Sequence, residues 1–444
     1  MGLVKAPDAS ASGRGLRLGK LGLTLTGSYL GYQFQNLFLG EEAKTRKRRE
    51  FNHQTSRHIS RELGELKGPV MKLGQILSMQ SQLLPAEAIQ ELASLQMQAP
   101  GMHPTLARAQ FKASLGKDPE AVFRHFSPEP FAAASLGQVH LATTKRGEKV
   151  AVKIQYPGIA KAIDNDFKLL RSVTLPGRIA GYAPKDLLDE IQRGFAEETD
   201  YLKEAANIRY FRQALERLDF VKVPSVLEDL TTERVLTMSF IEGRSVGEFL
   251  ASKPSKAVLD RIGSRLVELY HYQIQCLGVL HADHQPGNYL FRSDGSIGLV
   301  DYGCVKRLAI DFADLSACCV NRTWREGAGA AAHVCRLIFG PNVSIRRAQK
   351  MFGDLEALVE LLFPEPPAGR FPVDFGKAEL LNRMVKCYGA ALKHKLTNPE
   401  FAFVTRAELG LVSLLHQLSS VVNTREIWRR VHDLAIKDHC AVSR

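Results

Sequence analysis

Two aspartates and one asparagine, placed past the middle of the chain, most constrain what it can fold into. Asn288 lies five residues after Asp283, and Asp301 lies thirteen residues after Asn288. A turn at residues 293–296 and a buried-type strand at 297–300 separate the last two. A loop, a hairpin and a strand end at these spacings bring together a base and two ligands for a hard metal ion. Carboxylate and amide oxygens suit Mg²⁺, which shares the phosphates of a nucleotide.

An upstream lysine strengthens this interpretation. Two β-type runs, VHLATT and EKVAVKIQ, flank the short turn Lys145-Arg146-Gly147, a pattern that predicts a β-hairpin. Lys153 lies in the second run, between β-branched and small residues. Because a buried lysine is costly without an anionic partner, the pattern favours a ligand or ion-pair role. A surface lysine with its stem along the strand is the ordinary alternative.

Composition excludes several classes of protein. The 444 residues are 45% hydrophobic and 24% charged, as in soluble globular proteins. This balance argues against a disordered, collagen-like or multi-span membrane protein, and the length predicts about two to four domains. Seven cysteines without a C-x-x-C pair argue against a disulfide framework or a zinc ribbon. We therefore expect a reducing, intracellular compartment.

Positive charge is concentrated in the N-terminal part of the sequence. The net charge is +12, and residues 1–60 contribute +6 through ten Lys/Arg against four Asp/Glu. Such a zone faces solvent or anionic lipid, and nucleic acid ranks last because no aromatic-interleaved basic strand accompanies it. Residues 16–40 combine spaced glycines with polar side chains, which favours a packed or interfacial helix over a true membrane span. No secretory signal peptide is expected, and the segment is predicted to be membrane-adjacent.

The remaining segments are predicted to be mostly helical. Residues 234–240 form a strand by composition, whereas helical patterns cover residues 41–98, 105–116, 156–230 and 256–278. Within these helices, Lys72 and Gln75 share a polar ridge. Four acids form a cluster further on, namely Glu197, Glu198, Asp200 and Glu204. From the residues alone, solvated helix faces are the simpler interpretation of both groups.

Together these motifs resemble those of the UbiB/ADCK (AarF-type) family of atypical protein-kinase-like proteins. Lys72-Leu73-Gly74-Gln75 is similar to the family's K-x-G-Q signature, and Ala132-Ala133-Ala134-Ser135 to its alanine-rich nucleotide loop. Glu198-Thr199-Asp200 is similar to its E-x-D motif. The run from His281 through Asn288 resembles the catalytic loop, and Asp301-Tyr302-Gly303 the metal-binding D-F-G. The resemblance covers residues 65–310 motif by motif.

The resemblance implies a two-lobed, protein-kinase-like α+β fold. A helical N-terminal extension would carry the K-x-G-Q motif, and the C-terminal lobe would be mostly helical. The expected parts are a membrane-adjacent segment, a helical extension, an N-lobe with a helical insertion, and a C-lobe, at residues 1–40, 41–104, 105–242 and 243–444.

It also implies catalytic roles, with ATP or ADP and Mg²⁺ as the cofactors. Lys153 would be catalytic, holding the α- and β-phosphates and pairing with Glu204 on the equivalent of helix C. Asp283 would be the base or proton acceptor. Asn288 and Asp301 would be the metal ligands.

Two further groups of residues follow from the same resemblance. Ala132, Ala133, Ala134 and Ser135 would cover the phosphates, and the stretch from Met238 to Glu242 would be the linker against which adenine packs. Glu198 and Asp200 would face Lys72 and Gln75 in a regulatory contact. The helix that carries Lys72 and Gln75 would lie across the side of the site where a protein substrate otherwise docks.

The sequence departs from the family pattern at three places. His284-Gln285 stands between Asp283 and Pro286, where the family commonly has Pro-His, and neither position is an implied ligand. Tyr302 replaces the usual phenylalanine and adds a hydroxyl that needs a partner. Residues 308–340 turn directly into predicted helices without an A-P-E-type motif, which argues against a conventional peptide platform.

We therefore expect an atypical kinase or ATPase that uses Mg-ATP at a membrane, with water or a small lipid head group as acceptor. Support of ubiquinone or other isoprenoid-lipid metabolism is implied by the resemblance alone. The expected partners are a nucleotide, an anionic membrane surface or isoprenoid lipid, and lipid-biosynthesis enzymes, but no nucleic acid. Oligomeric state, and a bacterial cytoplasmic or organellar location, stay open.

Two alternatives remain beside this expectation. The first is a non-catalytic, nucleotide-gated module that binds lipids or partner enzymes. The second is a small-molecule kinase of the aminoglycoside or choline type, against which the K-x-G-Q helix and the alanine-rich loop stand.

Overall fold

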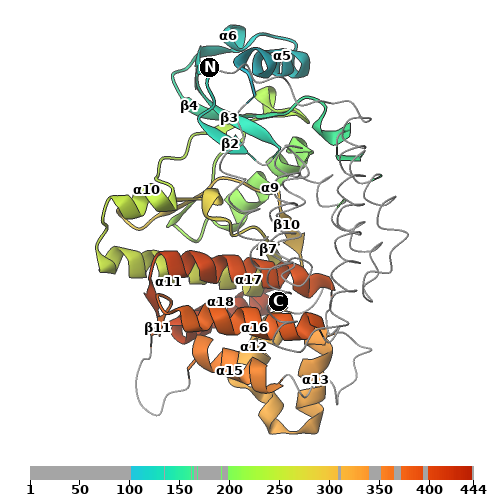
Figure 1. The fold of residues 1–444 in the computed structure, drawn as a ribbon, viewed down its shortest axis with the longest axis vertical. Coiled ribbons are helices and arrows are strands. Elements are labelled where there is room, and N and C mark those ends of the chain that lie inside the picture. The colour runs from blue at the N-terminus through green and yellow to red at the C-terminus, as the bar shows by residue number, and fades with distance from the viewer. Residues whose placement is uncertain are drawn as a thin grey trace, which may run out of the picture. The chain divides into compact units, whose positions relative to one another are not determined.

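The computed structural model combines helices with antiparallel sheet, which confirms the predicted α+β class (Figure 1). It describes residues 102–134, 136–161, 163–164, 168, 192, 199–308, 312–339, 352–364, 372–393 and 399–442. The predictions for residues 1–101, including Lys72 and Gln75, lie outside the described residues, as do those for Ser135 and Glu198.

The chain forms two compact units. The first comprises the described residues up to Ala205 together with Val226–Ser239, and the second comprises Ala206–Ser225 and the described residues from Phe240 onward. The domain boundaries expected at residues 40, 104 and 242 stay predictions.

The first unit is built on a five-stranded antiparallel sheet in which β1, β3, β4 and β6 are neighbours in that order and β2 pairs with β3. The strands are β1 (Phe123–Phe126), β2 (Ala132–Ala134), β3 (Gly137–Thr144), β4 (Lys149–Gln155) and β6 (Val235–Ser239). The helical elements are α5 (Pro104–Leu115), α6 (Pro119–Val122), the 3-10 turn η2 (Glu228–Leu230) and the first turn of α9 (Tyr201–Ala214).

The predicted hairpin is confirmed as β3 and β4. Gly147 turns the chain at φ +90°, a left-handed conformation that glycine adopts without a steric penalty. The Thr144 N–H donates to the Glu148 carbonyl at 2.9 Å and closes the turn. The resulting register places Lys153 opposite Val139 on one side and Leu236 of β6 on the other. Lys153 therefore lies on a central strand of the sheet.

Helix α5 covers one face of this sheet, as Figure 1 shows at its upper end. Pro104 begins the helix at the position where its missing N–H costs nothing, and Gly116 ends it in a left-handed conformation at φ +71°. Phe111 of α5 is fully buried and packs against Phe123 and Phe126 of β1, with ring centroids 5.8 and 6.1 Å away. This aromatic contact fixes the predicted 105–116 helix on the sheet.

The second unit is mostly helical. Its helices are the rest of α9, α10 (Val246–Ala251), α11 (Lys256–Tyr272), α12 (Phe312–Asn321), α13 (Ala328–Phe339), α15 (Phe352–Leu362), α16 (Ala378–Lys393), α17 (Pro399–Gln417) and α18 (Thr424–Val442). Shorter turns are η3 (Gln273–Leu277), η4 (Pro286–Asn288) and η5 (Thr323–Glu326). Its strands are β5 (Val221–Lys222), β7 (Val279–His281), β8 (Tyr289–Phe291), β9 (Ile297–Leu299), β10 (Val305–Arg307), β11 (Val373–Asp374) and β12 (Val421–Val422).

Helix α11 is the central support of this unit. It continues into the π-helical turn η3 and ends at Gly278 in a left-handed conformation at φ +58°, close to the predicted end of the 256–278 helix. It packs against α17 and α18, and the chain after Gly278 forms β7 directly. Strand β7 pairs with β10, while β8 pairs with β9. These two small ladders hold the loops that carry the predicted catalytic residues.

The prediction of helix throughout residues 156–230 was wrong at its end. Val221 and Lys222 form β5, which pairs in parallel with β9 at Ile297 and Gly298. This two-residue strand is stabilised by pairing with β9 and by burial of Val221. It is too short for local periodicity to predict it.

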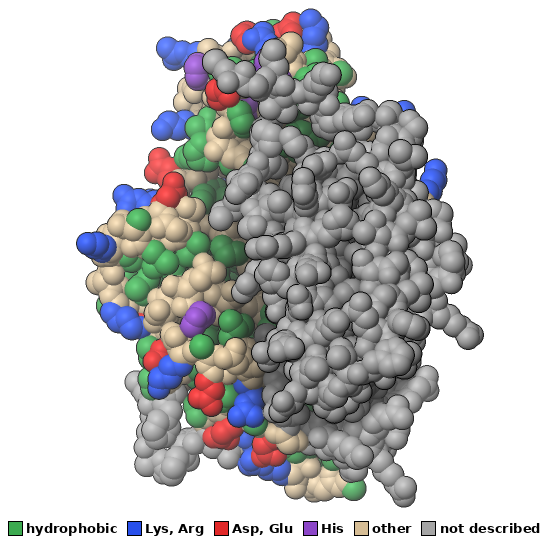
Figure 2. All heavy atoms as spheres, viewed as in Figure 1, with side chains coloured by type: hydrophobic (Ala, Val, Ile, Leu, Met, Phe, Trp, Pro, Cys, Tyr) green, Lys and Arg blue, Asp and Glu red, His purple; other side chains and the backbone are tan. Residues whose placement is uncertain are grey.

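No helix in the described ranges is long and apolar enough to cross a bilayer. The glycine-spaced stretch at residues 16–40 lies outside those ranges. On the face drawn in Figure 2, Lys and Arg side chains of the described residues are interspersed with Asp and Glu. This face of the described residues therefore carries no broad surface of one charge sign.

Candidate functional site

A buried ion pair forms the centre of the candidate site in the first unit. The Nζ atom of Lys153 donates to both carboxylate oxygens of Glu204, each at 2.8 Å. Lys153 is 5% exposed and Glu204 is 3% exposed. The pair satisfies the expectation that a lysine in this strand needs an anionic partner, and the low exposure excludes a surface lysine with a solvated head.

Tyr201 completes the surroundings of the lysine. Its ring centroid lies 5.1 Å from Lys153 Nζ, a distance at which the face of the ring attracts a cation. Tyr201 is 1% exposed and stands at the first position of α9, three residues before Glu204. One helical turn therefore supplies both the anion and the aromatic ring. Sequence reasoning missed Tyr201, because nothing local distinguishes it from an ordinary core tyrosine.

The alanine-rich segment forms one arm of a hairpin instead of an irregular loop. Ala132, Ala133 and Ala134 are strand β2 and pair with Val139, Gln138 and Gly137 of β3. Ala132 and Ala133 are exposed and Ala134 is half-buried, so three small side chains line an accessible edge. The backbone approaches closely at Gly137, where an added Cβ would lie 2.3 Å from the Ile154 carbonyl oxygen.

The implied adenine linker begins inside a strand. Met238 belongs to β6, pairs with Ala151 of β4 and is 5% exposed, so it is a core residue of the sheet and not part of a connecting segment. Glu242 follows the end of β6 and is exposed. The expected linker therefore starts within β6 at Met238, and its residues after Ser239 lie beyond the strand. That adenine packs against this stretch stays a prediction.

Asp200 has a clear structural role at the start of α9. Its Oδ1 atom accepts hydrogen bonds from the backbone N–H groups of Leu202 and Lys203, at 3.0 and 3.3 Å. The first N–H groups of a helix lack an acceptor in a preceding turn, so Asp200 caps the N-terminus of α9. The regulatory contact expected between Glu198, Asp200 and the K-x-G-Q helix stays a prediction, because its other members lie outside the described residues.

In the second unit, Asp283 and Asn288 lie in one short loop between β7 and β8. The Asn288 Nδ2 group donates to the Asp283 carbonyl at 3.0 Å, which closes the loop and fixes the orientation of the amide. Both residues are half-buried. The 3-10 turn η4, started by Pro286, brings Asn288 back beside Asp283.

Asp301 is brought to the same loop by two strand contacts. The Val300 N–H donates to the Asn288 carbonyl at 3.1 Å, and the Ala282 N–H donates to the Cys304 carbonyl at 2.9 Å. Asp301 Oδ1 accepts from the Gly303 N–H at 3.0 Å, which directs its carboxylate. The structure thus brings together the loops of Asp283, Asn288 and Asp301, the three residues that most constrain the fold at the sequence level.

His281 positions Asp301 through the backbone. The His281 Nε2 atom forms a 2.6 Å hydrogen bond with the Asp301 carbonyl. The backbone N–H of His281 donates to Gln273 Oε1 at 2.7 Å. Both His281 and Gln273 are fully buried. Sequence reasoning placed His281 in the catalytic-loop motif but gave it no role, and it missed Gln273. The sequence offered no local signal for this contact, because the burial of Gln273 and His281 is set by tertiary packing.

Tyr302 is held in an apolar pocket of the second unit. Its ring centroid lies 5.5 Å from that of Phe211 and 5.7 Å from that of His281, and its carbonyl accepts from Asn207 Nδ2 at 2.9 Å. Burial, followed by Tyr289 and Asp301, raises the pKa of its phenol well above the ordinary value. The hydroxyl therefore stays protonated at neutral pH.

The chemistry of these donors fits a hard divalent cation. Asp301 offers a carboxylate and Asn288 an amide oxygen, because the amide nitrogen of Asn288 is engaged with Asp283. Magnesium prefers oxygen ligands and takes only one or two carboxylates from the protein. The residues present therefore suit a cation that is shared with phosphate groups.

Comparison with known proteins gives a family match. Residues 94–329 match the model of the ABC1 atypical kinase-like domain. Among curated relatives, the Arabidopsis thaliana protein ACTIVITY OF BC1 COMPLEX KINASE 7, chloroplastic, is 34% identical over 270 residues, covering 60% of this chain and 38% of its own length. The Caenorhabditis elegans atypical kinase coq-8, mitochondrial, is 28% identical over 387 residues, covering 84% of this chain and 50% of its own length. The chain thus spans half or less of these two relatives.

A solved structure is similar over most of the chain. It is the complex of Rv3197 with erythromycin from Mycobacterium tuberculosis, with a TM-score of 0.59 and 25% sequence identity. The similarity covers 87% of this chain and 98% of the other. Shared architecture therefore extends well beyond the residues matched by the family model.

Proposed function

Because the chain belongs to the ABC1 atypical kinase-like family, the group that includes UbiB, COQ8 and ADCK proteins, we propose that it binds Mg²⁺-ATP and transfers or hydrolyses the γ-phosphoryl group. Membership confirms the predicted family, and with it the protein-kinase-like fold.

The observation that carries the proposal is the Lys153–Glu204 pair. Desolvating two charges costs several kcal/mol per ion by order of magnitude, and packed apolar residues often do as well or better for stability. A buried ion pair between a central strand and α9 is therefore weak evidence for a purely stabilising role. A lysine held in one orientation by two 2.8 Å hydrogen bonds is, in contrast, well placed to present positive charge to phosphates.

The roles of the other residues follow from their chemistry. Bound Mg²⁺-ATP would supply the transferable phosphoryl group and a cation that neutralises its charge. Asn288 and Asp301 would hold the cation, and Asp283 would accept the proton of the attacking hydroxyl or water. His281 keeps the Asp301 backbone in place. The edge at Ala132, Ala133 and Ala134, with Ser135, would cover the phosphates.

We further propose that the acceptor and the location are lipid-related. Two relatives are named as chloroplastic and mitochondrial kinases, and the resemblance implies support of ubiquinone or other isoprenoid-lipid metabolism. The basic N-terminal residues would contact an anionic membrane surface, since each Lys or Arg near such a surface contributes about 1 kcal/mol. Isoprenoid lipids and lipid-biosynthesis enzymes are the proposed partners.

The test is phosphate release from Mg²⁺-ATP by the full chain, with and without anionic vesicles. Asp301→Asn should lower the release at least a hundredfold, because it removes the charged oxygen ligand without changing the shape of the side chain. Asp294→Asn is the matched control, since Asp294 is an exposed turn residue whose side chain accepts hydrogen bonds from Ser296 through an oxygen that asparagine keeps. Its release should equal that of the wild type.

The outcomes separate the alternatives. Release that depends on Asp301 and rises with vesicles supports a membrane-tuned kinase or ATPase. Absence of release, with nucleotide binding that is lost in Asp301→Asn, would favour the nucleotide-gated binding module. Rapid phosphorylation of a soluble alcohol would favour a small-molecule kinase. Unchanged release in Asp301→Asn would contradict the proposal.

A further inference from the structure

Three side chains with metal-binding atoms meet between α12 and α13 of the second unit. Asp314 and Cys318 lie one turn apart on α12, and His333 faces them from α13. The His333 Nε2 atom lies 2.9 Å from Asp314 Oδ2, and Cys318 Sγ lies 3.7 Å from Asp314 Oδ1. All three ligand atoms lie within 4.8 Å of one another.

We propose that Asp314, Cys318 and His333 bind a zinc ion that joins α12 to α13. Thiolate, imidazole and carboxylate are the three kinds of protein ligand that zinc takes. Magnesium and calcium prefer oxygen ligands alone, so this mixed set discriminates against them. The site is separate from the Mg²⁺ ligands proposed above and does not depend on them.

The spacing of the ligand atoms suits tetrahedral coordination. With zinc bonds of about 2.0–2.3 Å, neighbouring ligand atoms in a tetrahedron lie roughly 3.3–3.8 Å apart. The Cys318–Asp314 distance of 3.7 Å already falls in this range. The His333–Asp314 hydrogen bond, at 2.9 Å, has to lengthen slightly to admit the ion between the two atoms.

The charge around Cys318 also favours a cation. Cys318 is 7% exposed, and burial raises the pKa of its thiol above the ordinary value. A hydrogen bond with Thr323 lowers this pKa in part, whereas the carboxylates of Asp314 and Glu326 raise it further. A cation at this place would reverse that balance, because zinc takes the thiolate form. On binding, the Cys318 Sγ–H bond breaks, a zinc–sulfur bond forms and the proton passes to solvent. The proton that His333 Nε2 directs at Asp314 Oδ2 moves to Nδ1, which leaves the Nε2 lone pair for the metal.

The ion has a route to the site. The side chains of Asp314 and His333 are 43% and 47% exposed, so solvent reaches two of the three ligands. Glu326, at the end of η5, brings a further carboxylate near the thiol. The fourth position would be taken by water or by Glu326.

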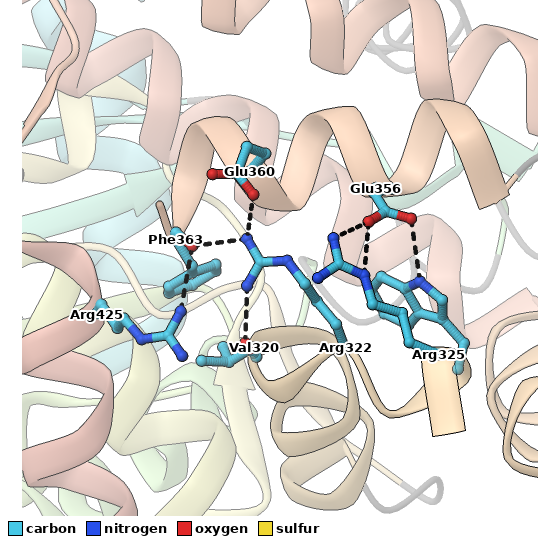
Figure 3. Close-up of polar contacts among 8 residues, drawn as sticks. Val320, Arg322, Arg325, Glu356, Glu360, Phe363 and Arg425 are labelled. Carbon is cyan, nitrogen blue, oxygen red and sulfur yellow. Dashed lines mark hydrogen bonds and ion pairs between the residues drawn. The ribbon is translucent and has the colours of Figure 1, made fainter. Parts of the chain in front are cut away.

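The turn between α12 and α13 is bonded to α15 and to the residue that follows it. Between α12 and α13 the chain turns at Arg322, whose φ of +54° is uncommon for a residue with a side chain. Figure 3 shows its guanidinium bonded to the Val320 and Phe363 carbonyls and to Glu360 of α15, at 3.3, 3.0 and 2.7 Å. Next to it, Arg325 pairs with Glu356 of the same helix. These contacts attach the turn between α12 and α13 to α15.

Cobalt is the direct probe, because Co²⁺ occupies zinc sites and is coloured. The metal-depleted full chain is titrated with Co²⁺ in the presence of excess Mg²⁺. The wild type should show a thiolate-to-cobalt charge-transfer band with intense ligand-field bands of tetrahedral cobalt, and Zn²⁺ should remove both. Cys318→Ser should abolish the charge-transfer band, and His333→Gln should weaken Co²⁺ binding at least tenfold. Zinc should also raise the melting temperature by a few degrees in the wild type but not in His333→Gln.

Matched controls keep the test specific. Cys276→Ser changes a half-buried thiol of the same unit that lies outside the cluster, and it should leave the bands unchanged. Asp301→Asn should leave them unchanged as well, which separates this site from the one proposed for Mg²⁺-ATP. Because the His333 side chain is half-exposed, His333→Gln should fold normally, as circular dichroism will check. A wild type without thiolate bands, or bands that survive in Cys318→Ser, would overturn the proposal.

Discussion

Replacing Glu204 with glutamine should show how much the first unit depends on its buried ion pair. The change removes the charge but keeps the shape of the side chain. Loss of one member of a buried pair leaves the other charge uncompensated, which costs about 3–5 kcal/mol. The Tyr201 ring, 5.1 Å from Lys153 Nζ, stays in place and offsets part of that cost. We therefore expect the free energy of unfolding to fall by about 2–4 kcal/mol.

The assay is urea unfolding of the full chain, followed by circular dichroism and by hydrogen exchange at the β4 amides. Exchange at β4 assigns the loss to the first unit. The double variant Lys153→Met/Glu204→Gln should be more stable than the sum of the two single changes by about 1–3 kcal/mol, because it removes both charges of the pair together.

An exposed pair of the same unit provides the control. Arg108 and Glu120 are joined at 2.7 Å, with side chains 46% and 54% exposed. Arg108→Gln should cost less than about 1 kcal/mol, since water already solvates both charges. If Glu204→Gln costs no more than Arg108→Gln, or if the double variant is simply additive, the reasoning from burial is wrong.

Three further predictions concern the rest of the fold. Burial lowers the pKa of His271 from 6.5 to about 4, so the unfolded chain binds the proton first and stability falls as pH drops from about 6.5 toward 4. This loss should reach about 2 kcal/mol at pH 5 in urea titrations and should be absent in His271→Gln. Gly137→Ala should lower the melting temperature by several degrees in calorimetry, because its Cβ would meet the Ile154 carbonyl oxygen at 2.3 Å. Arg322→Met should cost about 2–4 kcal/mol by urea unfolding, since the Val320 carbonyl and Glu360 lose the guanidinium as a donor and the part-buried Phe363 carbonyl is left with the 3.4 Å bond from Arg425. A loss below about 1 kcal/mol would contradict this role of the contacts in Figure 3.

Local patterns determined the individual elements well. The β3–β4 hairpin, α5, β6 and α11 all lie where alternation, helical periodicity and turn residues predict them. The order of Asp283, Asn288 and Asp301 likewise predicted a loop, a hairpin and a strand end. These features depend on neighbours within about ten residues, so the sequence contains the information directly. The family resemblance rested on the same short motifs, and the match over residues 94–329 confirmed it.

Only the tertiary structure decided which distant residues meet. Lys153 and Glu204 are 51 residues apart, and the acidic cluster around Glu204 was equally consistent with a solvated helix face. Tyr201, Gln273 and the parallel pairing of β5 with β9 were not expected at all. The reason is physical. A buried charge or amide is costly without a partner, whereas the same group in water is not. Which side chains are buried together is set by the packing of whole elements and not by the residues beside them in the chain.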